Sequence, residues 1–393
     1  MKPIITSFLD LDQYKISMAQ CVLHRFSEAQ VEFEFKNRTN TIDLFPYWNQ
    51  IQEQINSLAD LKFTEGELKY LSTIRYLKKD FIDFLRILRL NPKCVKIYNN
   101  NGEFGINITG SWLYTIWFET MILSIISEVY NQKNSSETNM QLGLGKLENN
   151  LCLINNAQIG NKDKLFRLIE FGTRRRFSKE YHKRVVELLI KKIPNNLFGT
   201  SNVKFAMDYG LKPIGTFAHE AVEAMQGMNC RLVDSQKMFL EAWAQEYRGD
   251  LGIALTDTIG IDSFLRDFDM YFAKLYDGTR QDSGNPVEFT KKVINHYISM
   301  GINPKEKVIV YSDSLDIPKA IKLWREFEGQ VKTSYGIGTK LTADIPGITP
   351  VNIVIKMTKC NGKPVAKLSD SKGKTMCRDA EYLQYLKKVF NKE

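Results

Sequence analysis

Apolar and polar residues in the first 150 positions follow two different periods. Apolar residues recur every three or four positions over 43–59 and 77–90, a spacing typical of amphipathic helices. Runs that favour β-strands lie at 31–36, 95–99 and 104–108. This mixture of helical and strand-like segments predicts an α+β domain over residues 1–150.

Between residues 151 and 350, short apolar runs alternate with longer amphipathic segments, such as 178–193 and 234–247. The strand-like runs are LFRLIEF (165–171), KPIGTF (212–217), LGIALTD (251–257), VIVYSDS (308–314) and VKTSYGIG (331–338). Strands that alternate with helices are typical of parallel βα units, and polar or glycine residues follow nearly every run. We therefore predict an α/β fold with an irregular β/α barrel and a site at the carboxyl ends of its strands; a doubly wound open sheet is the alternative.

The pattern changes again over residues 351–393. Strand-like runs at 352–357, 364–368 and 374–377 follow one another closely, and Asn361-Gly362 is a strong hairpin signal. We expect these strands and a final helix to return to the N-terminal part. The first domain is then discontinuous and is interrupted by the barrel.

The composition is that of an ordinary globular protein. Its 393 residues are 43% hydrophobic and 25% charged, which is enough for a large core and about two domains. The six cysteines are scattered without a CxxC pair, and acidic residues occur where a signal peptide would have its apolar run. The most apolar stretch, 113–130, contains Glu119 and Glu128. We therefore expect a cytoplasmic protein in a reducing compartment, with no membrane span.

The net charge of +9 fits nucleic acid, a membrane surface or anionic metabolites as partners. Lysines such as Lys191 and Lys192 lie near the ends of probable helices, where they are typical of a solvated face. No stretch interleaves basic and aromatic residues, so we expect no nucleic-acid partner. The run Arg174, Arg175 and Arg176 differs because it directly follows a strand-like segment. We predict that this arginine cluster faces an anion.

Two loops that follow strand-like runs carry residues suited to phosphate. Gly336 and Gly338, with Thr339 next to them, lack the side chains that would keep a phosphate away from the backbone N–H groups. Ser312 and Asp313 end the preceding strand-like run. A lone GxGT is more often a tight turn, but two adjacent loops of this kind favour a phosphate site.

The segment RQDSGNP places Arg280 two residues before Asp282, in a turn with glycine and proline. An isolated pair of this kind is usually a local ion pair. At the same rim as the phosphate loops, the carboxylate is suited to a ribose diol or to Mg²⁺ bound to pyrophosphate. Arg280 is suited to a ring or to a carboxylate. We predict that both residues bind substrate.

His219 is one of only four histidines. The sequence contains neither HExxH nor histidine or cysteine partners at metal spacing, so zinc is poorly supported. Asp257 ends the run LGIALTD. A carboxylate that holds one imidazole nitrogen leaves the other free as a nucleophile or an acid. We therefore pair His219 with Asp257.

Taken together, the motifs resemble the nicotinate phosphoribosyltransferase family of the bacterial type, in order and over nearly the whole chain. They are LDLDQYKISM, FGTRRRFS, FGTSN, GTFAHE, GIALTDT, RQDSGNP, SDSLD, GIGT, NIVIK and CNGKPVAKLSDS followed by Lys372, Gly373 and Lys374. The family condenses nicotinate with 5-phosphoribosyl 1-pyrophosphate (PRPP), giving nicotinate mononucleotide and pyrophosphate. ATP hydrolysis drives this reaction through a transient phosphohistidine. The resemblance therefore implies nicotinate, PRPP and ATP as substrates, with Mg²⁺ bound through their phosphates rather than by a protein cage.

The resemblance also implies a role for each matching residue. His219 would accept the phosphoryl group and Asp257 would orient it, while Asp282 would hold the ribose hydroxyls. Phe171 would stack on the pyridine ring, and Arg174 would face phosphate or pyrophosphate. Residues for the 5'-phosphate would be Ser312, Asp313, Gly336, Gly338 and Thr339, with Arg280 beside the nicotinate. Tyr14 and Arg38 resemble residues that a neighbouring subunit contributes, which implies a homodimer with shared sites.

Two rival functions differ in the features that they require. The nicotinamide phosphoribosyltransferases resemble this chain but carry an acid at the position of Ser201, and a carboxylate there would repel nicotinate. Ser201 therefore favours nicotinate. A noncatalytic nucleotide or RNA binder would use the net charge of +9 and would show salt-dependent binding without turnover.

Overall fold

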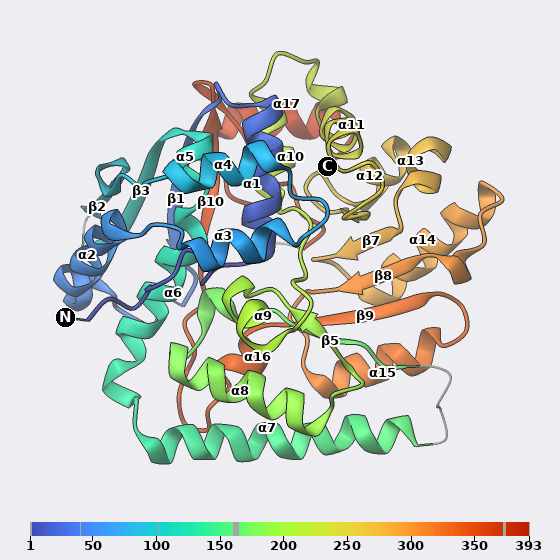
Figure 1. The fold of residues 1–393 in the computed structure, drawn as a ribbon. Helices are drawn as coiled ribbons and strands as arrows, with labels where there is room; N and C mark the ends of the chain where they lie inside the picture. Colours follow the sequence, from blue (N-terminus) through green and yellow to red (C-terminus); the bar gives the residue numbers. More distant parts are fainter. Residues whose placement is uncertain (1, 40, 101, 160–164, 372–374, 393) are drawn as a thin grey trace.

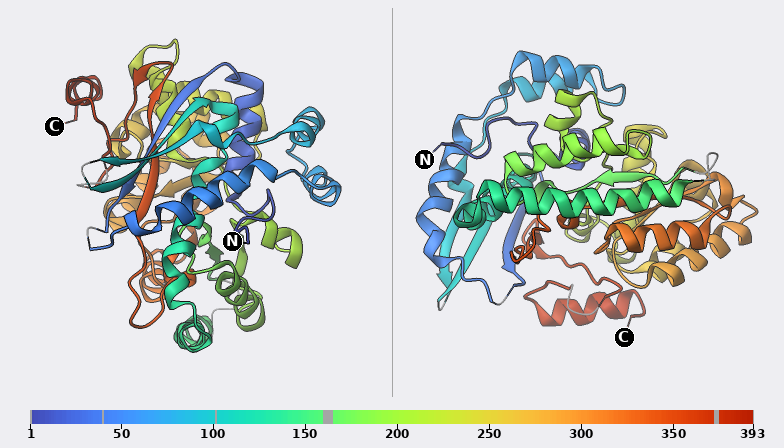
Figure 2. Two further views of the ribbon diagram at one scale, coloured as in Figure 1. Left: turned by 90° about the vertical axis from the view of Figure 1, so that its left-hand side faces the viewer. Right: turned by 90° about the horizontal axis from the view of Figure 1, so that it is seen from below.

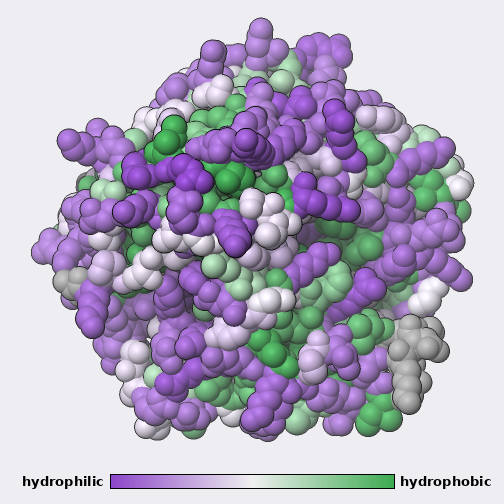
Figure 3. All heavy atoms as spheres, viewed as in Figure 1, coloured by the Kyte–Doolittle hydropathy of each residue, from purple (hydrophilic) through white to green (hydrophobic). Residues whose placement is uncertain are grey.

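The computed structural model describes residues 2–39, 41–100, 102–159, 165–371 and 375–392. Its strands form one antiparallel and one parallel sheet, with helices between and around them (Figure 1). This arrangement confirms the predicted mixed α/β class. Figure 3 shows that one face of the molecule is mostly hydrophilic, with separate hydrophobic patches. Across the described residues, no helix combines the length and apolarity needed to cross a bilayer.

The antiparallel sheet joins the two ends of the chain. Its strand order is β11-β10-β1-β3-β2. The strands are β1 (Gln30–Asn37), β2 (Val95–Asn100), β3 (Glu103–Ser111), β10 (Ile353–Cys360) and β11 (Lys363–Pro364). The C-terminal β10 pairs with β1 from Val31↔Cys360 to Asn37↔Ile353. The predicted strand at 364–368 is confined to Pro364, and the described part of 374–377 contains only a bridge between Met376 and Lys367.

The parallel sheet has the order β5-β4-β9-β8-β7-β6. Its strands are β4 (Leu168–Glu170), β5 (Leu197–Thr200), β6 (Ile253–Leu255), β7 (Gly278–Gln281), β8 (Val308–Tyr311) and β9 (Lys332–Ile337). This order does not reverse as it does in a doubly wound sheet. No ladder joins the edge strands β5 and β6 within the described residues, so barrel closure stays a prediction.

The predicted strand at 212–217 is irregular. Ile214 N donates to Thr200 O at 2.8 Å on the side of β5, and Thr216 Oγ1 donates to Ile253 O at 2.9 Å on the side of β6. Pro213 has no N–H to donate to a ladder, which explains why the segment contacts both edge strands without becoming a regular strand. The segment ends two residues before His219.

Helices from distant parts of the sequence hold the two sheets together. α10 (His219–Gln226) packs against β10 of the antiparallel sheet and against α11 (Ser235–Tyr247). α6 (Phe118–Asn131) contacts β10 and the 3-10 turn Thr173–Arg175. α6 includes most of the apolar segment 113–130 and is largely buried, as the sequence predicted. These contacts bring the loop after β4 and the helix α10 close to β10.

The remaining helices pack around the sheets. They are α1 (Gln13–Arg25), α2 (Trp48–Asn56), α3 (Glu65–Ser72), α4 (Lys79–Ile87), α5 (Trp112–Thr115), α7 (Glu137–Gln158), α8 (Lys179–Lys192), α9 (Val203–Tyr209), α12 (Ile261–Asp267), α13 (Met270–Leu275), α14 (Pro286–Ser299), α15 (Ile317–Phe327), α16 (Thr339–Thr342) and α17 (Ala380–Val389). The long α7 packs against α8 and α15 and runs along one side of the molecule (Figure 2). α17 packs on a small separate apolar cluster that includes Ile259, Leu368 and Leu386.

Candidate active site

A cavity of about 450 Å³ lies between the two sheets. Residues from α1, from the loops after β4, β5, β7, β8 and β9, from the start of α10 and from β10 line its wall. The predicted site residues in the wall are Tyr14, Arg38, Phe171, Arg174, Ser201, His219, Arg280, Asp282, Ser312, Asp313, Gly336, Gly338 and Thr339. Asp257 lies behind His219. The structure therefore brings residues from distant parts of the sequence to one cavity.

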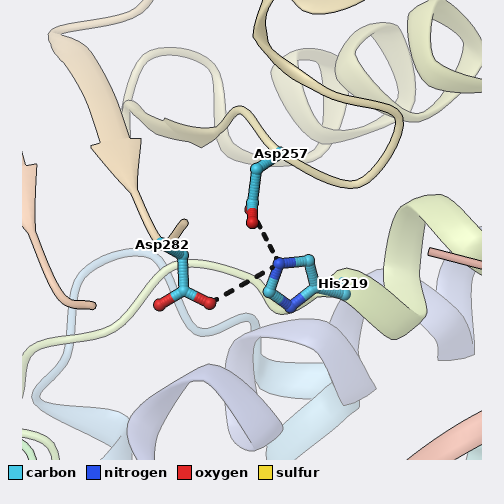
Figure 4. Close-up of side chains that lie close together, drawn as sticks. All are labelled: His219, Asp257 and Asp282. Atoms are coloured by element: carbon cyan, nitrogen blue, oxygen red, sulfur yellow. Dashed lines mark hydrogen bonds and ion pairs between the residues drawn. The ribbon is translucent and has the colours of Figure 1, made fainter. Parts of the chain in front are cut away.

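His219 is the first residue of α10, and two carboxylates approach the same nitrogen of its ring (Figure 4). Its Nε2 lies 2.8 Å from Asp257 Oδ1 and 3.6 Å from Asp282 Oδ2. Asp257 follows β6 and Asp282 follows β7, adjacent strands of the parallel sheet. The predicted His219–Asp257 contact is therefore present in the geometry. Since Nε2 is engaged, Nδ1 is the ring nitrogen left for chemistry.

Lys367, which the sequence reasoning did not single out, belongs to the same cluster. Its Nζ lies 2.8 Å from His219 Nε2 and 2.6 Å from Asp257 Oδ2. Lys367 is 148 residues from His219 and follows β11, so no strand-end pattern marks it. The only sequence signal was its position inside the motif KPVAKLSDS. The motif's last residues, Lys372, Gly373 and Lys374, lie outside the described residues.

Burial and the neighbouring charges make His219 neutral. Burial of the ring, followed by the Lys367 ammonium, lowers the pKa of His219 to about 4. Burial alone would raise the pKa of Asp257, but His219 and Lys367 hold it well below its usual value. Because the pKa of His219 is low, the imidazole keeps a free electron pair at neutral pH, as a nucleophile requires. One turn further along α10, burial raises the pKa of Glu223 to about 7.

Asp282 is held in place at the rim of the parallel sheet. Ser312 Oγ donates to Asp282 Oδ1 at 2.8 Å and lies 3.0 Å from Gln281 O. Arg280 donates to Phe217 O at 3.2 Å. Burial alone would raise the pKa of Asp282, but Arg280 and His219 lower it to about 2. A fixed, ionised carboxylate therefore lines the cavity.

Among the described residues, His219, Asp257 and Asp282 are the one group of metal-binding side chains close enough together to share an ion. The Lys367 ammonium lies against two of these three side chains, and a cation between them would be repelled. We assign no metal to this group.

Gly336 and Gly338 have a packing role that the sequence did not reveal. A Cβ atom at Gly336 would come within 2.3 Å of the Phe171 ring, and one at Gly338 within 2.9 Å of Phe171 O. The absence of both side chains leaves room for Phe171 beside the cavity. Thr339 begins α16 directly after them. Phosphate binding at this loop stays a prediction.

Ser201 is not the isolated hydroxyl that the sequence argument assumed. Its Oγ donates to Asp12 Oδ1 at 2.6 Å, and Asp12 also lines the cavity. Burial raises the pKa of Asp12 although Arg174, 3.5 Å from its Oδ2, acts against the rise. A carboxylate therefore lies next to Ser201 already, and sequence reasoning missed it because Asp12 is 189 residues away.

The expectation that all three clustered arginines face an anion is wrong for Arg176. Arg174 and Arg175 line the cavity. Arg176 is fully buried and makes two hydrogen bonds to Asp10, at 2.6 and 3.0 Å. Its guanidinium is neutralised inside the protein, so only the first two arginines are available to a ligand.

Tyr14 and Arg38 line the cavity of their own chain. The resemblance implies that a neighbouring subunit contributes these residues to a shared site, and this stays a prediction. Tyr14 is buried and its hydroxyl lies 3.3 Å from Glu119. The homodimer itself stays a prediction.

Comparison with known proteins identifies the family. The family model "Nicotinate phosphoribosyltransferase (NAPRTase) family" matches residues 166–393, and the NAPRTase N-terminal domain matches residues 9–127. This chain belongs to the nicotinate phosphoribosyltransferase family. It is 48% identical to the nicotinate phosphoribosyltransferase of Burkholderia mallei, over 98% of this chain and 97% of the relative. It is 46% identical to that of Cupriavidus necator, over 99% and 98%.

Crystal structures of family members have the same fold. The structure of nicotinate phosphoribosyltransferase from Vibrio cholerae superposes with a TM-score of 0.95 at 38% identity, covering 100% of this chain and 95% of that one. The structure from Porphyromonas gingivalis gives 0.92 at 32% identity, covering 99% and 100%. The two-sheet architecture around the cavity is thus the fold of the nicotinate phosphoribosyltransferases.

Proposed function

We propose that the protein transfers the phosphoribosyl group of PRPP to nicotinate, giving nicotinate mononucleotide and pyrophosphate, as a step in NAD biosynthesis or salvage. Two buried donors of the cavity carry the proposal. Arg38 Nε and Arg280 Nε have no hydrogen-bond partner among the described residues, and both side chains line the cavity. An unsatisfied buried donor is unfavourable by about 1–3 kcal/mol or more. An anionic ligand that accepts from these nitrogens is therefore stabilised.

The cavity offers a place for each part of the substrates. Phe171 would stack on the pyridine ring, with Arg280 beside the nicotinate carboxylate. Asp282, oriented by Ser312, would accept hydrogen bonds from the ribose hydroxyls. Arg174 would face the pyrophosphate. The loops for the 5'-phosphate carry Ser312, Asp313, Gly336, Gly338 and Thr339.

The chemistry needs no protein nucleophile at the sugar. As the bond from C1 to pyrophosphate breaks, positive charge develops on the ribose ring, and the ionised Asp282 stabilises it. The lone pair of the nicotinate nitrogen then forms the new bond to C1. Mg²⁺ would enter with the phosphates of PRPP and neutralise the leaving pyrophosphate.

We also propose that His219 links ATP hydrolysis to this transfer. Its Nδ1 lone pair would form a bond to the γ-phosphorus of ATP while the bond to the β–γ bridging oxygen breaks, which releases ADP. Water later takes the phosphoryl group from the ring as inorganic phosphate. The neutral state of His219 and its contact with Asp257 support this role. A transient phosphohistidine at His219 follows.

Nicotinamide is the alternative substrate. Ser201 is engaged by Asp12, so its hydroxyl does not by itself explain a preference for nicotinate. Arg280 lines the cavity, and its guanidinium can pair with the carboxylate of nicotinate, which the neutral amide lacks. The names of the relatives support the same choice.

The assembly and the location are further parts of the proposal. We propose a homodimer with shared active sites, to which a neighbouring subunit contributes Tyr14 and Arg38, as the resemblance implies. The six cysteines are all free thiols, which supports a reducing, cytoplasmic setting.

Steady-state kinetics with nicotinate, nicotinamide and PRPP test the function. We expect nicotinate mononucleotide as the product, and an Arg280→Met protein whose KM for nicotinate is at least tenfold higher. Arg231→Met is the matched control because the Arg231 side chain is 80% exposed and pairs only with Asp234 among the described residues. Salt-dependent nucleotide or RNA binding without turnover would instead favour the noncatalytic binder.

A further inference from the structure

One nitrogen of His219 has two partners with opposite requirements. Asp257 Oδ1, at 2.8 Å from Nε2, can only accept a hydrogen bond. Lys367 Nζ, also at 2.8 Å from Nε2, can only donate one. A neutral imidazole nitrogen carries either a proton or a lone pair in the ring plane, so Nε2 satisfies one of these partners at a time.

The two arrangements have different chemical consequences. When Nε2–H donates to Asp257, the lone pair is on Nδ1, and Nδ1 is nucleophilic. When Nε2 accepts from Lys367, the proton is on Nδ1, and Nδ1 cannot attack. Lys367 has a second acceptor in Asp257 Oδ2, at 2.6 Å, so it remains satisfied in the first arrangement. Ser283 Oγ donates to the same oxygen and helps to hold the carboxylate in place.

We propose that Lys367 is a positioning residue: its ammonium neutralises Asp257, so that Asp257 orients the His219 ring without drawing a second proton onto it. A buried carboxylate next to an imidazole by itself favours the imidazolium form. An imidazolium has no lone pair and cannot accept a phosphoryl group. The positive charge of Lys367 offsets this effect of Asp257, and the hydrogen bond from Nε2 to Asp257 remains.

The other charges around the ring do not replace Lys367. Asp282, from the loop after β7, lies 3.6 Å from Nε2 and favours the imidazolium form, as Asp257 does. Lys356, on β10, also lowers the pKa of His219, but its effect is smaller than that of Lys367. Glu220 and Glu223 follow on α10, and Glu220 is engaged by Lys15. Among the residues that the structure describes, Lys367 is thus the cation in direct contact with both His219 and Asp257.

The inference rests on the proposed role of His219, but its test does not require turnover. With four histidines in the chain, the ring signals in an NMR spectrum are few, and the signal missing from a His219→Asn protein assigns His219. In the wild-type protein, ¹⁵N shifts at pH 7 should show a protonated Nε2 and an unprotonated Nδ1. A protonated Nδ1, or an imidazolium at pH 7, overturns the proposal without any variant.

A pH titration of the His219 ring signal measures the effect of the Lys367 charge on the protonation of His219. We expect the protonation midpoint of His219 to rise by at least one pH unit in Lys367→Met and in Lys367→Gln. Lys367→Arg keeps the positive charge and should keep the midpoint near that of the wild type. Lys359→Met is the matched control, because Lys359 is an exposed lysine that pairs with Glu32 outside the cavity. An unchanged midpoint in either folded neutral variant overturns the proposal.

Phosphorylation kinetics connect the charge to function. With γ-labelled ATP, the acid limb of the labelling rate should move to higher pH in Lys367→Met by the same shift as the NMR midpoint. A purely structural role would lower the rate equally at every pH. If the wild-type protein takes up no label at any pH, the proposed function of His219 fails, while the NMR titration still decides whether Lys367 controls its proton.

Discussion

The guanidinium of Arg176 and the carboxylate of Asp10 form a two-bond ion pair, at 2.6 and 3.0 Å, in which both side chains are essentially inaccessible to solvent. Asp10 also accepts from Asn202 at 2.9 Å. The pair joins the N-terminal segment to the loop after β4, which carries Phe171 and Arg174. The ion pair therefore holds this loop in place, although neither of its side chains lines the cavity.

Removal of one partner leaves a buried charge without compensation. We expect Arg176→Met or Asp10→Asn to reduce the free energy of unfolding by about 3–5 kcal/mol. Arg184→Met should change it by less than about 1 kcal/mol, because the ion pairs of Arg184 with Glu137 and Glu180 are accessible to solvent. Urea denaturation at pH 7 measures both effects. Equal stability of the Arg176 and Arg184 variants would contradict the structural role of the buried pair.

The same pair makes stability depend on pH. Burial alone would raise the pKa of Asp10, but Arg176 and Lys179 hold it well below its usual value. In the unfolded chain the pKa is about 3.9. The stabilisation is thus fully present above about pH 4 and is lost as the pH falls toward the lower pKa of the folded protein. The urea midpoint should fall less steeply between pH 5 and pH 3 in Asp10→Asn than in the wild type. Identical slopes would assign acid sensitivity to other groups.

Gly336 should be intolerant of any side chain. In Gly336→Ala the new methyl group would meet the Phe171 ring at 2.3 Å, so the ring must shift from its place beside the cavity. We expect a rise of at least tenfold in the KM for nicotinate, with a smaller effect on the KM for PRPP. Gly145→Ala is the control, since Gly145 lies in α7 with no atom within 4 Å of the added carbon. Unchanged kinetics in Gly336→Ala would show that Phe171 does not contact the pyridine ring.

The position of Ser201 tests charge selection. Ser201→Asp would add a carboxylate beside Asp12 and the nicotinate carboxylate; at about 4 Å and an effective dielectric near 20 the repulsion is roughly 4 kcal/mol before screening. The ratio of kcat/KM for nicotinate to that for nicotinamide should fall by at least tenfold. Ser201→Ala should change the ratio much less. If the ratio is the same in a folded Ser201→Asp protein, this position does not face the pyridine substituent.

Strand-end patterns predicted most of the site, because the carboxyl ends of parallel strands meet at one edge of a sheet. Asp257, Asp282, Ser312 and Gly336 were found in this way. The pattern fails for side chains whose partners come from elsewhere in the chain. Lys367 reaches His219 from the C-terminal segment, which carries no such signal.

Local sequence also does not reveal which charges are neutralised inside the protein. The run of three arginines is uniform in sequence, but Arg176 forms a buried ion pair with Asp10, 166 residues away, and does not line the cavity. Similarly, Asp12, 189 residues away in sequence, accepts the hydrogen bond of the Ser201 hydroxyl. Pro213 interrupts a segment whose apolar pattern predicted a regular strand. Each of these differences is set by a long-range contact or by a missing N–H donor.

The most direct test of the role of His219 is the end point of the reaction. Nicotinate, PRPP and Mg²⁺ are incubated to equilibrium with the wild-type and the His219→Asn proteins, with and without ATP, and nicotinate mononucleotide and inorganic phosphate are measured. The wild-type protein should reach a higher ratio of product to nicotinate with ATP, with phosphate released. His219→Asn should reach one end point under both conditions. A His219→Asn protein that reaches the wild-type, ATP-driven end point would contradict the assignment of His219 as the phosphoryl acceptor.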